Sequence, residues 1–326
     1  MPTSDPDVAI AIITTTNEPK MVMDCVDSLL KSLSDRLRVD IWVVDNATAS
    51  NNGELIKRTY PSVNVVRNDQ KRGFAYNNNM VWARTKSSRY FLILNDDTII
   101  HENFIESLVK VADEHPEGGF FGPKILNWDL TLQRSAYLLP SPVRNLLEAL
   151  GLHRLFARAA FFDDFRNWDC NDFRPVPFLI GAALLARQEM LSQIGGLDED
   201  FFAYGEDTDW CKRAVDAGWK IYLVPSATMV HLGGQSTLDV PTAKHVEFLR
   251  GHYRYIRKHH GAIGVMVYRI GEFLKHSSRW VAHSIRGNRA SATLHKEGLL
   301  FSAGMLNAKG LKELAAEQQS APSVLS

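Results

Sequence analysis

The chain has 326 residues, of which 45% are hydrophobic and 23% are charged, and its formal net charge is zero. This composition is typical of a globular protein with one large or two ordinary domains, and the zero charge argues against a nucleic-acid-binding protein. The three cysteines are far apart and form no CxxC pair, which indicates neither a disulfide framework nor a cysteine-rich metal site. Because no apolar run reaches the roughly 18 residues of a membrane span and no secretory leader is evident, we expect a cytoplasmic protein, or one held at the inner face of the membrane as a peripheral protein.

Short β-branched or aromatic runs alternate with helix-like runs through the first hundred residues. Strands are expected at 8–14, 39–45, 63–67 and 90–96, and helices at 19–33, 52–60 and 75–85. This alternation predicts an α/β fold with a mostly parallel central sheet flanked by helices. Ligands of such sheets bind beyond the carboxyl ends of the strands, so the polar segments that follow the strands are expected to meet on one rim. These segments are 14–18, 45–48, 68–73 and 95–97.

The first strand is followed by neither GxGxxG nor GxxxxGK[ST], which weakens the case for a dinucleotide oxidoreductase or a P-loop protein. A helix at 102–114 and a strand near 119–125 come next. The stretch 127–177 is rich in aromatic residues and Asp but has little clear period, so we expect a long loop or small helical insertion over the rim. Regular elements then return, with a helix from about 207 to 217 and a strand that ends at His231.

Two adjacent carboxylates, Asp96 and Asp97, follow a run fit for a buried strand. Side chains alternate in an extended segment, so Asn95 and Asp97 are expected to point to one side and Asp96 to the other. One carboxylate would then bind a hard divalent cation while its neighbour accepts from a hydroxyl or holds the loop. An Asx turn without a metal ion is the alternative at this point.

A second acidic cluster, Glu206, Asp207 and Asp209, stands at the start of a predicted helix. Carboxylates favour the first turn of a helix, so a capping role is one interpretation. The cluster exceeds what capping needs, however, and a base that deprotonates a hydroxyl must be a carboxylate or an imidazole. His231 is either a structural residue at a strand end or the nitrogen ligand of a Mg²⁺ or Mn²⁺ site.

Eight motifs occur in order between residues 8 and 236. They are 13–17 (ITTTN), 43–46 (VVDN), Asn68 with 73–75 (GFA) and Asn79, 94–97 (LNDD), 181–182 (GA), 195–199 (GGLDE) with 201–202 (FF), 206–207 (ED) with Asp209, and His231. This series resembles the family 2 glycosyltransferases, which have the nucleotide-diphospho-sugar transferase (GT-A) fold, and is most similar to their rhamnosyltransferase-type members. Each motif is weak alone, but eight in order over most of the chain are specific.

The resemblance implies an inverting, metal-dependent glycosyltransferase. Its donor would be a dTDP- or UDP-linked sugar, with dTDP-rhamnose as the first choice. Its acceptor would be a lipid-linked saccharide, with the 127–177 stretch on the acceptor side. The reaction would belong to cell-surface polysaccharide synthesis. Asp207 would be the general base with Glu206 in support, and Asp97 and His231 would bind Mg²⁺ or Mn²⁺. Asp45 would accept from the imide N–H of the base. The residues that the resemblance implies for nucleotide-sugar binding are Thr14, Thr16, Glu18, Asp45, Asn46, Arg72, Gly73 and Asp96.

Two other functions stay open on the sequence alone. A nucleotidyltransferase uses a related sheet, but it usually carries a Gly-rich loop with Lys or Arg directly after the first strand, which TTTNEP lacks. A non-catalytic scaffold that binds a sugar nucleotide or a membrane is the other, although Asp97, Asp207 and His231 together argue against it.

The C-terminal region differs from the rest of the chain in charge. Residues 241–300 carry 11 Lys and Arg against 3 Asp and Glu, although the whole chain has 37 of each. We therefore expect a catalytic domain over 1–240 and a basic helical region over 241–326. A helix over 263–286 would gather on one side the apolar residues Met266, Ile270, Phe273, Leu274, Trp280, Val281 and Ile285. This helix either packs on the body of the protein with its basic face in solvent, or lies on an anionic membrane surface. A nucleic-acid partner is not expected, because no recognition motif accompanies the charge.

Overall fold

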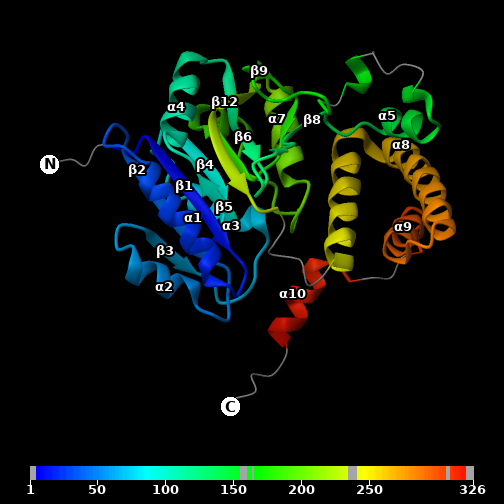
Figure 1. Ribbon diagram of the computed structural model, residues 1–326, viewed down its shortest axis with the longest axis horizontal. Coiled ribbons are helices and arrows are strands. Elements are labelled where there is room, and N and C mark those ends of the chain that lie inside the picture. Colours follow the sequence, from blue (N-terminus) through cyan, green and yellow to red (C-terminus); the bar gives the residue numbers. More distant parts are fainter. Residues whose placement is uncertain (1–4, 155–159, 164, 234–240, 306–308, 321–326) are drawn as a thin grey trace. The chain divides into compact units, whose positions relative to one another are not determined.

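The computed structural model describes residues 5–154, 160–163, 165–233, 241–305 and 309–320 (Figure 1). The chain divides into two compact units. The first, the sheet unit, comprises Met1–Tyr137, Phe165–Asp200 and Glu206–Leu238. The second, the helical unit, comprises Leu138–Asp164, Phe201–Gly205 and Asp239–Ser326. The domain boundary predicted at residue 240 lies outside the described residues.

The sheet unit is built on a mixed, mostly parallel sheet with the strand order β3-β2-β1-β4-β11-β6-β12-β5. Its strands are β1 (Val8–Thr14), β2 (Val39–Asp45), β3 (Asn64–Arg67), β4 (Tyr90–Asn95), β5 (Thr98–Ile100), β6 (Gly118–Leu126), β11 (Ala183–Arg187) and β12 (Lys220–His231). The four strands predicted in the first hundred residues pair in parallel, as expected. β11 lies antiparallel between β4 and β6, a placement that the sequence did not predict.

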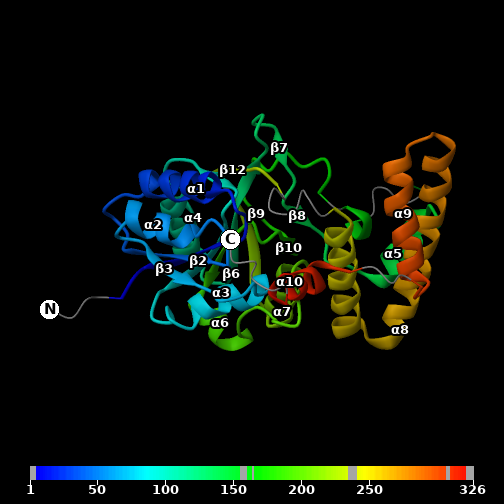
Figure 2. The ribbon, with the colours of Figure 1, turned by 90° about the horizontal axis from the view of Figure 1, so that it is seen from below.

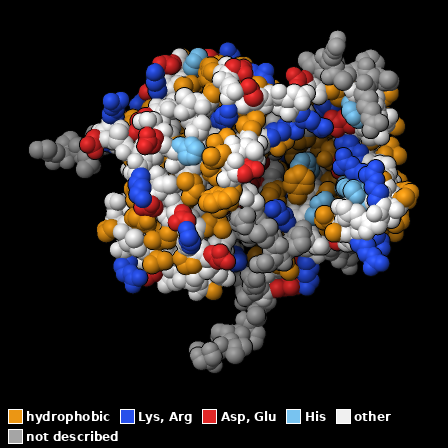
Figure 3. All heavy atoms as spheres, in the orientation of Figure 1, with side chains coloured by type: hydrophobic (Ala, Val, Ile, Leu, Met, Phe, Trp, Pro, Cys, Tyr) orange, Lys and Arg blue, Asp and Glu red, His pale blue; other side chains and the backbone are white. Residues whose placement is uncertain are grey.

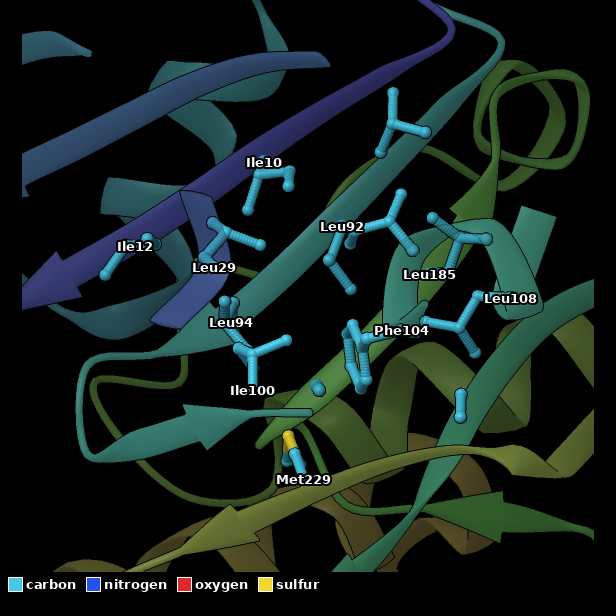
Figure 4. Close-up of a cluster of buried hydrophobic side chains, with 14 of the residues drawn as sticks. Ile10, Ile12, Leu29, Leu92, Leu94, Ile100, Phe104, Leu108, Leu185 and Met229 are labelled. Atoms are coloured by element: carbon cyan, nitrogen blue, oxygen red, sulfur yellow. The ribbon is translucent and has the colours of Figure 1, made fainter. Parts of the chain in front are cut away.

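Helices cover both faces of this sheet. They are α1 (Pro19–Ser32), α2 (Asn52–Thr59), α3 (Phe74–Trp82), α4 (Phe104–Glu114), α6 (Gln188–Ile194) and α7 (Glu206–Asp216). Figure 2 shows α1, α2 and α4 on one face and α3, α6 and α7 on the other. Alternate residues of each strand face each side, so Ile10 and Leu92 meet Leu29 of α1 and Phe104 of α4 in one buried cluster (Figure 4). Burial of these apolar side chains is the main term that holds the strand ends in place.

The stretch 127–177 has short elements where the sequence indicated no period. β7 (Leu132–Gln133) pairs with β6, β9 (Arg174–Pro175) pairs with β12, and β8 (Ala136–Tyr137) pairs with β10 (Phe178–Leu179) in a separate two-stranded sheet. Between them lie α5 (Pro142–Ala149) and the 3-10 turns η1 (Leu152–Arg154) and η2 (Ala160–Phe162). The stretch is therefore shared, with 138–164 in the helical unit and the rest in the sheet unit.

The helical unit contains α5, α8 (Pro241–Ile285), α9 (Arg289–Ser302) and α10 (Leu311–Ser320). α8 is two helical segments joined at Gly261, whose φ of 64° and ψ of −168° break the helix. Glycine has no Cβ to oppose this conformation, so the break occurs there. Among the described residues, no helix contains a stretch that is long and apolar enough to span a membrane.

Candidate active site

Asp97 and His231 lie side by side at the edge of the sheet. β5 and β12 pair antiparallel with Thr98 opposite His231, and Leu232 N donates to Asp97 O at 2.9 Å. This pairing puts Asp97 Oδ1 3.2 Å from His231 Nε2, with the two side chains only 4% and 11% exposed. Asn95 Nδ2 lies 3.3 Å from the same ring nitrogen. Asn95 and Asp97 thus point to one side, as the alternation predicted.

Asp96 points away from this pair and is 4% exposed. Burial, and then the charge of Asp97, raise the pKa of Asp96 to about 7, against the lowering effect of the Thr14 hydroxyl. One oxygen of this carboxylate, Oδ2, is buried with no hydrogen-bond partner in the described structure. An unpartnered buried carboxylate oxygen is costly, so the local charge balance favours a cation or a ligand hydroxyl close to Asp96.

The Asp97–His231 pair fits a divalent cation. One carboxylate oxygen and one imidazole nitrogen are ligands that Mn²⁺ accepts, and two cis ligands of an octahedral ion with bonds of about 2.1 Å lie about 3.0 Å apart. In the described part of the chain no three His, Cys, Asp or Glu side chains form a metal-binding group. Two protein ligands suit an ion that takes its other ligands from a diphosphate and from water.

Asp45 ends β2 and is fully buried. Its Oδ1 accepts from Thr48 N at 2.8 Å, and its Oδ2 accepts from Gly53 N at 2.9 Å and from Arg67 Nη1 at 2.7 Å. The carboxylate thus holds the turn into α2. Contact of Asp45 with a nucleotide base stays a prediction, and it requires the Arg67 side chain, which is 45% exposed, to move aside.

A buried asparagine, Asn52, joins the first and second rim segments. Its Nδ2 donates to Thr14 Oγ1 at 3.1 Å and to Thr16 O at 2.9 Å, from the first turn of α2. Thr14 is completely buried, Thr16 is partly exposed, and Glu18 is exposed at the N-cap of α1. The sequence analysis missed Asn52, whose only signal was its place seven residues after Asp45 in a helix start.

A network of asparagines holds the backbone of Arg72. Asn46 Oδ1 accepts from Arg72 N and Asn46 Nδ2 donates to Arg72 O, both at 2.9 Å. Asn68 Nδ2 bridges Asn46 Oδ1 at 2.9 Å and Asn77 Oδ1 at 2.7 Å. The exposed Arg72 side chain lies over the Tyr76 ring, and Gly73 then caps α3. The predicted residues Asn46, Arg72 and Gly73 are therefore brought together, with Asn77 as a member that the sequence analysis did not name.

Asp207 lies in the first turn of α7 and is partly exposed, whereas Glu206 and Asp209 are buried. Its Oδ2 accepts from Gly181 N at 2.9 Å, and its Oδ1 accepts from Thr208 N at 2.7 Å. A Cβ at Gly181 would lie 3.2 Å from Asp207 Cβ, a tight contact that would require Asp207 to shift by a few tenths of an ångström. Asp209 has a structural role, since its carboxylate accepts from Arg213 Nε at 2.8 Å.

The Gly181 contact places Asp207 next to the strand that carries the acidic pair. Ala182 O, adjacent to Gly181, accepts from Asn95 N at 2.9 Å, and Asn95 reaches His231. The structure therefore brings Asp207 and the Asp97–His231 pair to neighbouring strand ends. Asn79 lies outside this group of residues. Its side chain forms hydrogen bonds with both the backbone N and the backbone O of Leu197, and so it joins α3 to the loop that contains Leu197.

Known proteins are similar to this chain in sequence and in fold. Residues 10–195 match the model of glycosyl transferase family 2. A relative from Mycobacterium tuberculosis, an N-acetylglucosaminyl-diphospho-decaprenol L-rhamnosyltransferase, is 26% identical over 240 residues, which are 70% of this chain and 78% of that protein. A hexosyltransferase of low-salt glycan biosynthesis from Haloferax volcanii is 24% identical over 191 residues, 57% of each protein.

Solved structures show the same fold at low sequence identity. A mannosyltransferase from Pyrobaculum calidifontis, solved with GDP-Man and Mn²⁺, superposes with a TM-score of 0.56 at 16% identity, covering 98% of this chain and 85% of that chain. GalNAc-T7, solved with UDP, GalNAc and Mn²⁺, gives 0.58 at 14% identity, covering 96% and 57%. The GT-A fold and the enzyme class expected from the sequence are thereby confirmed, and the nucleotidyltransferase and scaffold alternatives are set aside. The chain belongs to glycosyl transferase family 2, in which it is a rhamnosyltransferase-like glycosyltransferase.

Proposed function

We propose that this enzyme transfers a sugar, with dTDP-rhamnose as the first candidate donor and a UDP-sugar as the second, to a lipid-linked saccharide, with inversion and with Mg²⁺ or Mn²⁺. The observation that carries the proposal is the 3.2 Å approach of Asp97 Oδ1 to His231 Nε2, with Asp207 fixed at the neighbouring strand end. The decaprenol-linked acceptor in the name of the mycobacterial relative supports a lipid carrier. A role in cell-surface polysaccharide synthesis follows from such an acceptor.

Asp207 is the proposed general base. It is partly exposed and is oriented by the Gly181 and Thr208 amides, so one carboxylate stays in a fixed position for an acceptor hydroxyl. As Asp207 takes the proton, the acceptor oxygen forms a bond to the anomeric carbon while the bond from that carbon to the diphosphate oxygen breaks. Attack occurs on the face opposite the leaving group, so the configuration inverts. Glu206, buried beside Asp207, is proposed to support the base.

The proposed donor contacts lie on the rim. Asp97 and His231 would hold the divalent ion, which supplies positive charge to the departing diphosphate. Arg72, whose backbone is held by Asn46, adds a second positive charge near the diphosphate or sugar. Asp96 would bind a ribose or sugar hydroxyl, and its unpartnered oxygen, which can accept a hydrogen bond, supports this role.

The base end of the nucleotide would meet the first two rim segments. Thr14, Thr16, Glu18 and Gly73 are the remaining proposed contacts, and Asp45 would reach the base imide once Arg67 moves aside. Asn52 holds these two segments together. A uracil or thymine base satisfies this set equally, which leaves the choice between UDP and dTDP to experiment.

A membrane contact through the 263–286 region is the second part of the proposal. All seven apolar residues of the predicted arc are exposed in the structure, from 37% for Leu274 and Trp280 to 81% for Ile285. The face that packs inside the helical unit carries Tyr268, in a buried apolar cluster, together with buried Gly271 and His276 and with Lys275, which pairs with Glu148 of α5 at 3.1 Å. The helix thus exposes an apolar arc in addition to the face that it buries, and an exposed apolar patch of this kind is typical of an interaction site.

An anionic lipid surface is the proposed occupant of this face. Hydrophobic side chains and Lys or Arg side chains occur together on the visible side of α8 and α9 (Figure 3). Arg279 and Arg286 are exposed on the same segment as the apolar arc. Apolar side chains that enter the boundary of a bilayer, next to basic groups that meet anionic headgroups, are typical of an interfacial helix. This location would place the enzyme peripherally on the inner face of the cell membrane, where a lipid-linked acceptor is found.

Donor hydrolysis and transfer by the purified protein test the proposed reaction. Incubation with dTDP-rhamnose or UDP-sugars, with and without Mn²⁺, should release dTDP or UDP only with the metal. Addition of a short-chain polyprenyl-diphospho-GlcNAc acceptor should increase release and give a product with inverted anomeric configuration by NMR. Equal turnover after complete chelation, or a retained configuration, would contradict the mechanism.

A further inference from the structure

A glutamine from the poorly patterned 127–177 stretch contacts the histidine of the candidate metal pair. Gln133 lies in β7, and β7 pairs with the end of β6 so that Leu132 lies opposite Leu126. Gln133 Oε1 is 2.6 Å from His231 Nδ1, and Gln133 Nε2 donates to His231 O at 3.1 Å. One side chain therefore contacts both the ring and the backbone of His231.

Hydrogen bonds within the β6–β7 turn determine how this glutamine is oriented. Asn127 Nδ2 donates to Thr131 Oγ1 at 3.0 Å and to Leu132 O at 3.4 Å, so Asn127 Oδ1 is the atom that faces Gln133. Gln133 Nε2 donates to that oxygen at 2.9 Å as well as to His231 O. With both acceptors on the nitrogen side, Gln133 Oε1 faces the imidazole ring.

The orientation of Gln133 decides where the His231 proton lies. An amide oxygen only accepts hydrogen bonds, so the contact at 2.6 Å requires a hydrogen on Nδ1. In the neutral ring Nε2 then carries a lone pair, which faces Asp97 Oδ1 at 3.2 Å and Asn95 Nδ2 at 3.3 Å. A lone pair and a carboxylate oxygen at that distance repel each other unless a proton or a metal ion lies between them.

We propose that Gln133 is a positioning residue that keeps His231 protonated at Nδ1, so that Nε2 is available to a divalent cation shared with Asp97. The inference rests on the metal site of the proposed function and adds to it the residue that prepares the ligand. Outer hydrogen bonds to metal-binding histidines commonly change metal affinity by about 10–100-fold. The turn that contains Asn127 and Thr131 thereby becomes part of the active site.

Two substitutions in the full chain separate positioning from general structural support. Gln133→Met removes the acceptor for Nδ1 and both donor bonds, whereas Gln133→Glu keeps an acceptor but loses the donor bonds. Mn²⁺ affinity in the presence of UDP is measured by electron paramagnetic resonance titration. We expect Gln133→Met to bind Mn²⁺ about 10–100-fold more weakly, and Gln133→Glu to stay within about threefold of the unmodified protein. Equal losses in both variants, or no loss in Gln133→Met, would overturn the inference.

Gln193→Met is the matched control, because Gln193 is exposed and accepts one bond from Trp219 Nε1 at 3.0 Å in the same unit. It should leave Mn²⁺ affinity unchanged. His231→Ala separates the two levels of the proposal. If it binds Mn²⁺ as the unmodified protein does, the metal assignment and this inference both fail; if it loses binding and Gln133→Met does not, only this inference fails.

A measurement on the unmodified protein needs no variant to fold. Two-dimensional ¹H–¹⁵N spectra of the imidazole groups at pH 8, without metal, report which ring nitrogen carries the proton. We expect the Nδ1–H tautomer for His231. A ring protonated at Nε2 would overturn the inference.

Discussion

Asp97 and His231 are separated by 133 intervening residues in the chain, yet their Oδ1 and Nε2 atoms are 3.2 Å apart because β5 and β12 pair antiparallel at the sheet edge. The first prediction concerns this pair. Asp97→Asn and His231→Ala should each weaken Mn²⁺-dependent binding of UDP or dTDP by at least about 100-fold, since loss of outer-sphere contacts alone costs about 10–100-fold. Calorimetry with and without Mn²⁺ measures the effect. Metal-dependent affinity that survives both changes would contradict the assignment.

The second prediction separates the base from the donor site. Asp207→Asn can still accept from Gly181 N but cannot take a proton, so transfer should fall by about 10²–10⁴-fold while the dissociation constant of the donor changes little. Initial rates and calorimetry on the same preparation measure both. Asp216→Asn is the control, because Asp216 is exposed on the same helix and pairs with Lys212. A variant Asp207→Asn with full turnover would rule out this carboxylate as the base.

The third prediction tests the asparagine network around Arg72. If Asn46 acts by holding the Arg72 backbone, Asn46→Ala and Arg72→Ala should each raise the KM for the donor, and the double variant should be little worse than Arg72→Ala alone. We expect roughly a tenfold effect for each, the size typical of one charge-assisted contact. Kinetics of the four proteins complete the cycle. Fully additive effects would show that the two residues act independently.

The fourth prediction concerns pH and the histidines of the helical unit. His295 Nδ1 lies 3.2 Å from His276 Nδ1, and the His295 ring stacks on the ring of His283. The charges of Arg279 and His245 also act on His295. Glu272 of α8 contacts His276 on the same helix. Burial, and then the charge of His276, lower the pKa of His295 from 6.5 to about 4. Between those pH values the unfolded chain binds more protons than the folded one, so stability falls as pH falls through the window.

Urea unfolding of the full chain between pH 7 and pH 4 measures this dependence. His295→Gln removes the titrating group. The slope of unfolding free energy against pH should therefore decrease by an amount that corresponds to less than one bound proton. An unchanged slope in His295→Gln would show that other groups account for the acid sensitivity.

The fifth prediction tests the outward apolar face of α8. Ile270→Glu and Phe273→Glu place a charge at positions 47% and 44% exposed, so each should weaken binding to anionic vesicles by about tenfold or more without unfolding the helix. Flotation with phosphatidylglycerol vesicles measures binding. Val215→Glu alters a 38% exposed residue of the sheet unit and should have no effect. Binding that is equal in all three variants would place the membrane contact elsewhere, and absence of binding by the unmodified protein would remove it.

Local sequence patterns determined the first strands of the sheet, the side-chain directions at 95–97 and the family. Alternating apolar runs predicted the first four strands and their parallel pairing, and side-chain alternation in 95–97 predicted that Asn95 and Asp97 share a side. The order of motifs predicted the family. These features depend on neighbours in the chain, so periods of 2 and 3.6 residues and short motifs are enough to find them.

Only the tertiary structure decided which groups meet. Asp45 has the residue type expected for a base contact, but Arg67, 22 residues later, and the backbone amides of Thr48 and Gly53 occupy its oxygens. Gln133 had no sequence signal, since its role arises from a two-residue strand placed against β6 and His231. The apolar arc of α8 was visible in the sequence, but its outward direction depends on the polar contacts with α5 and α9. A sequence pattern defines one face of an element, whereas the partner of that face is set by packing between segments far apart in the chain.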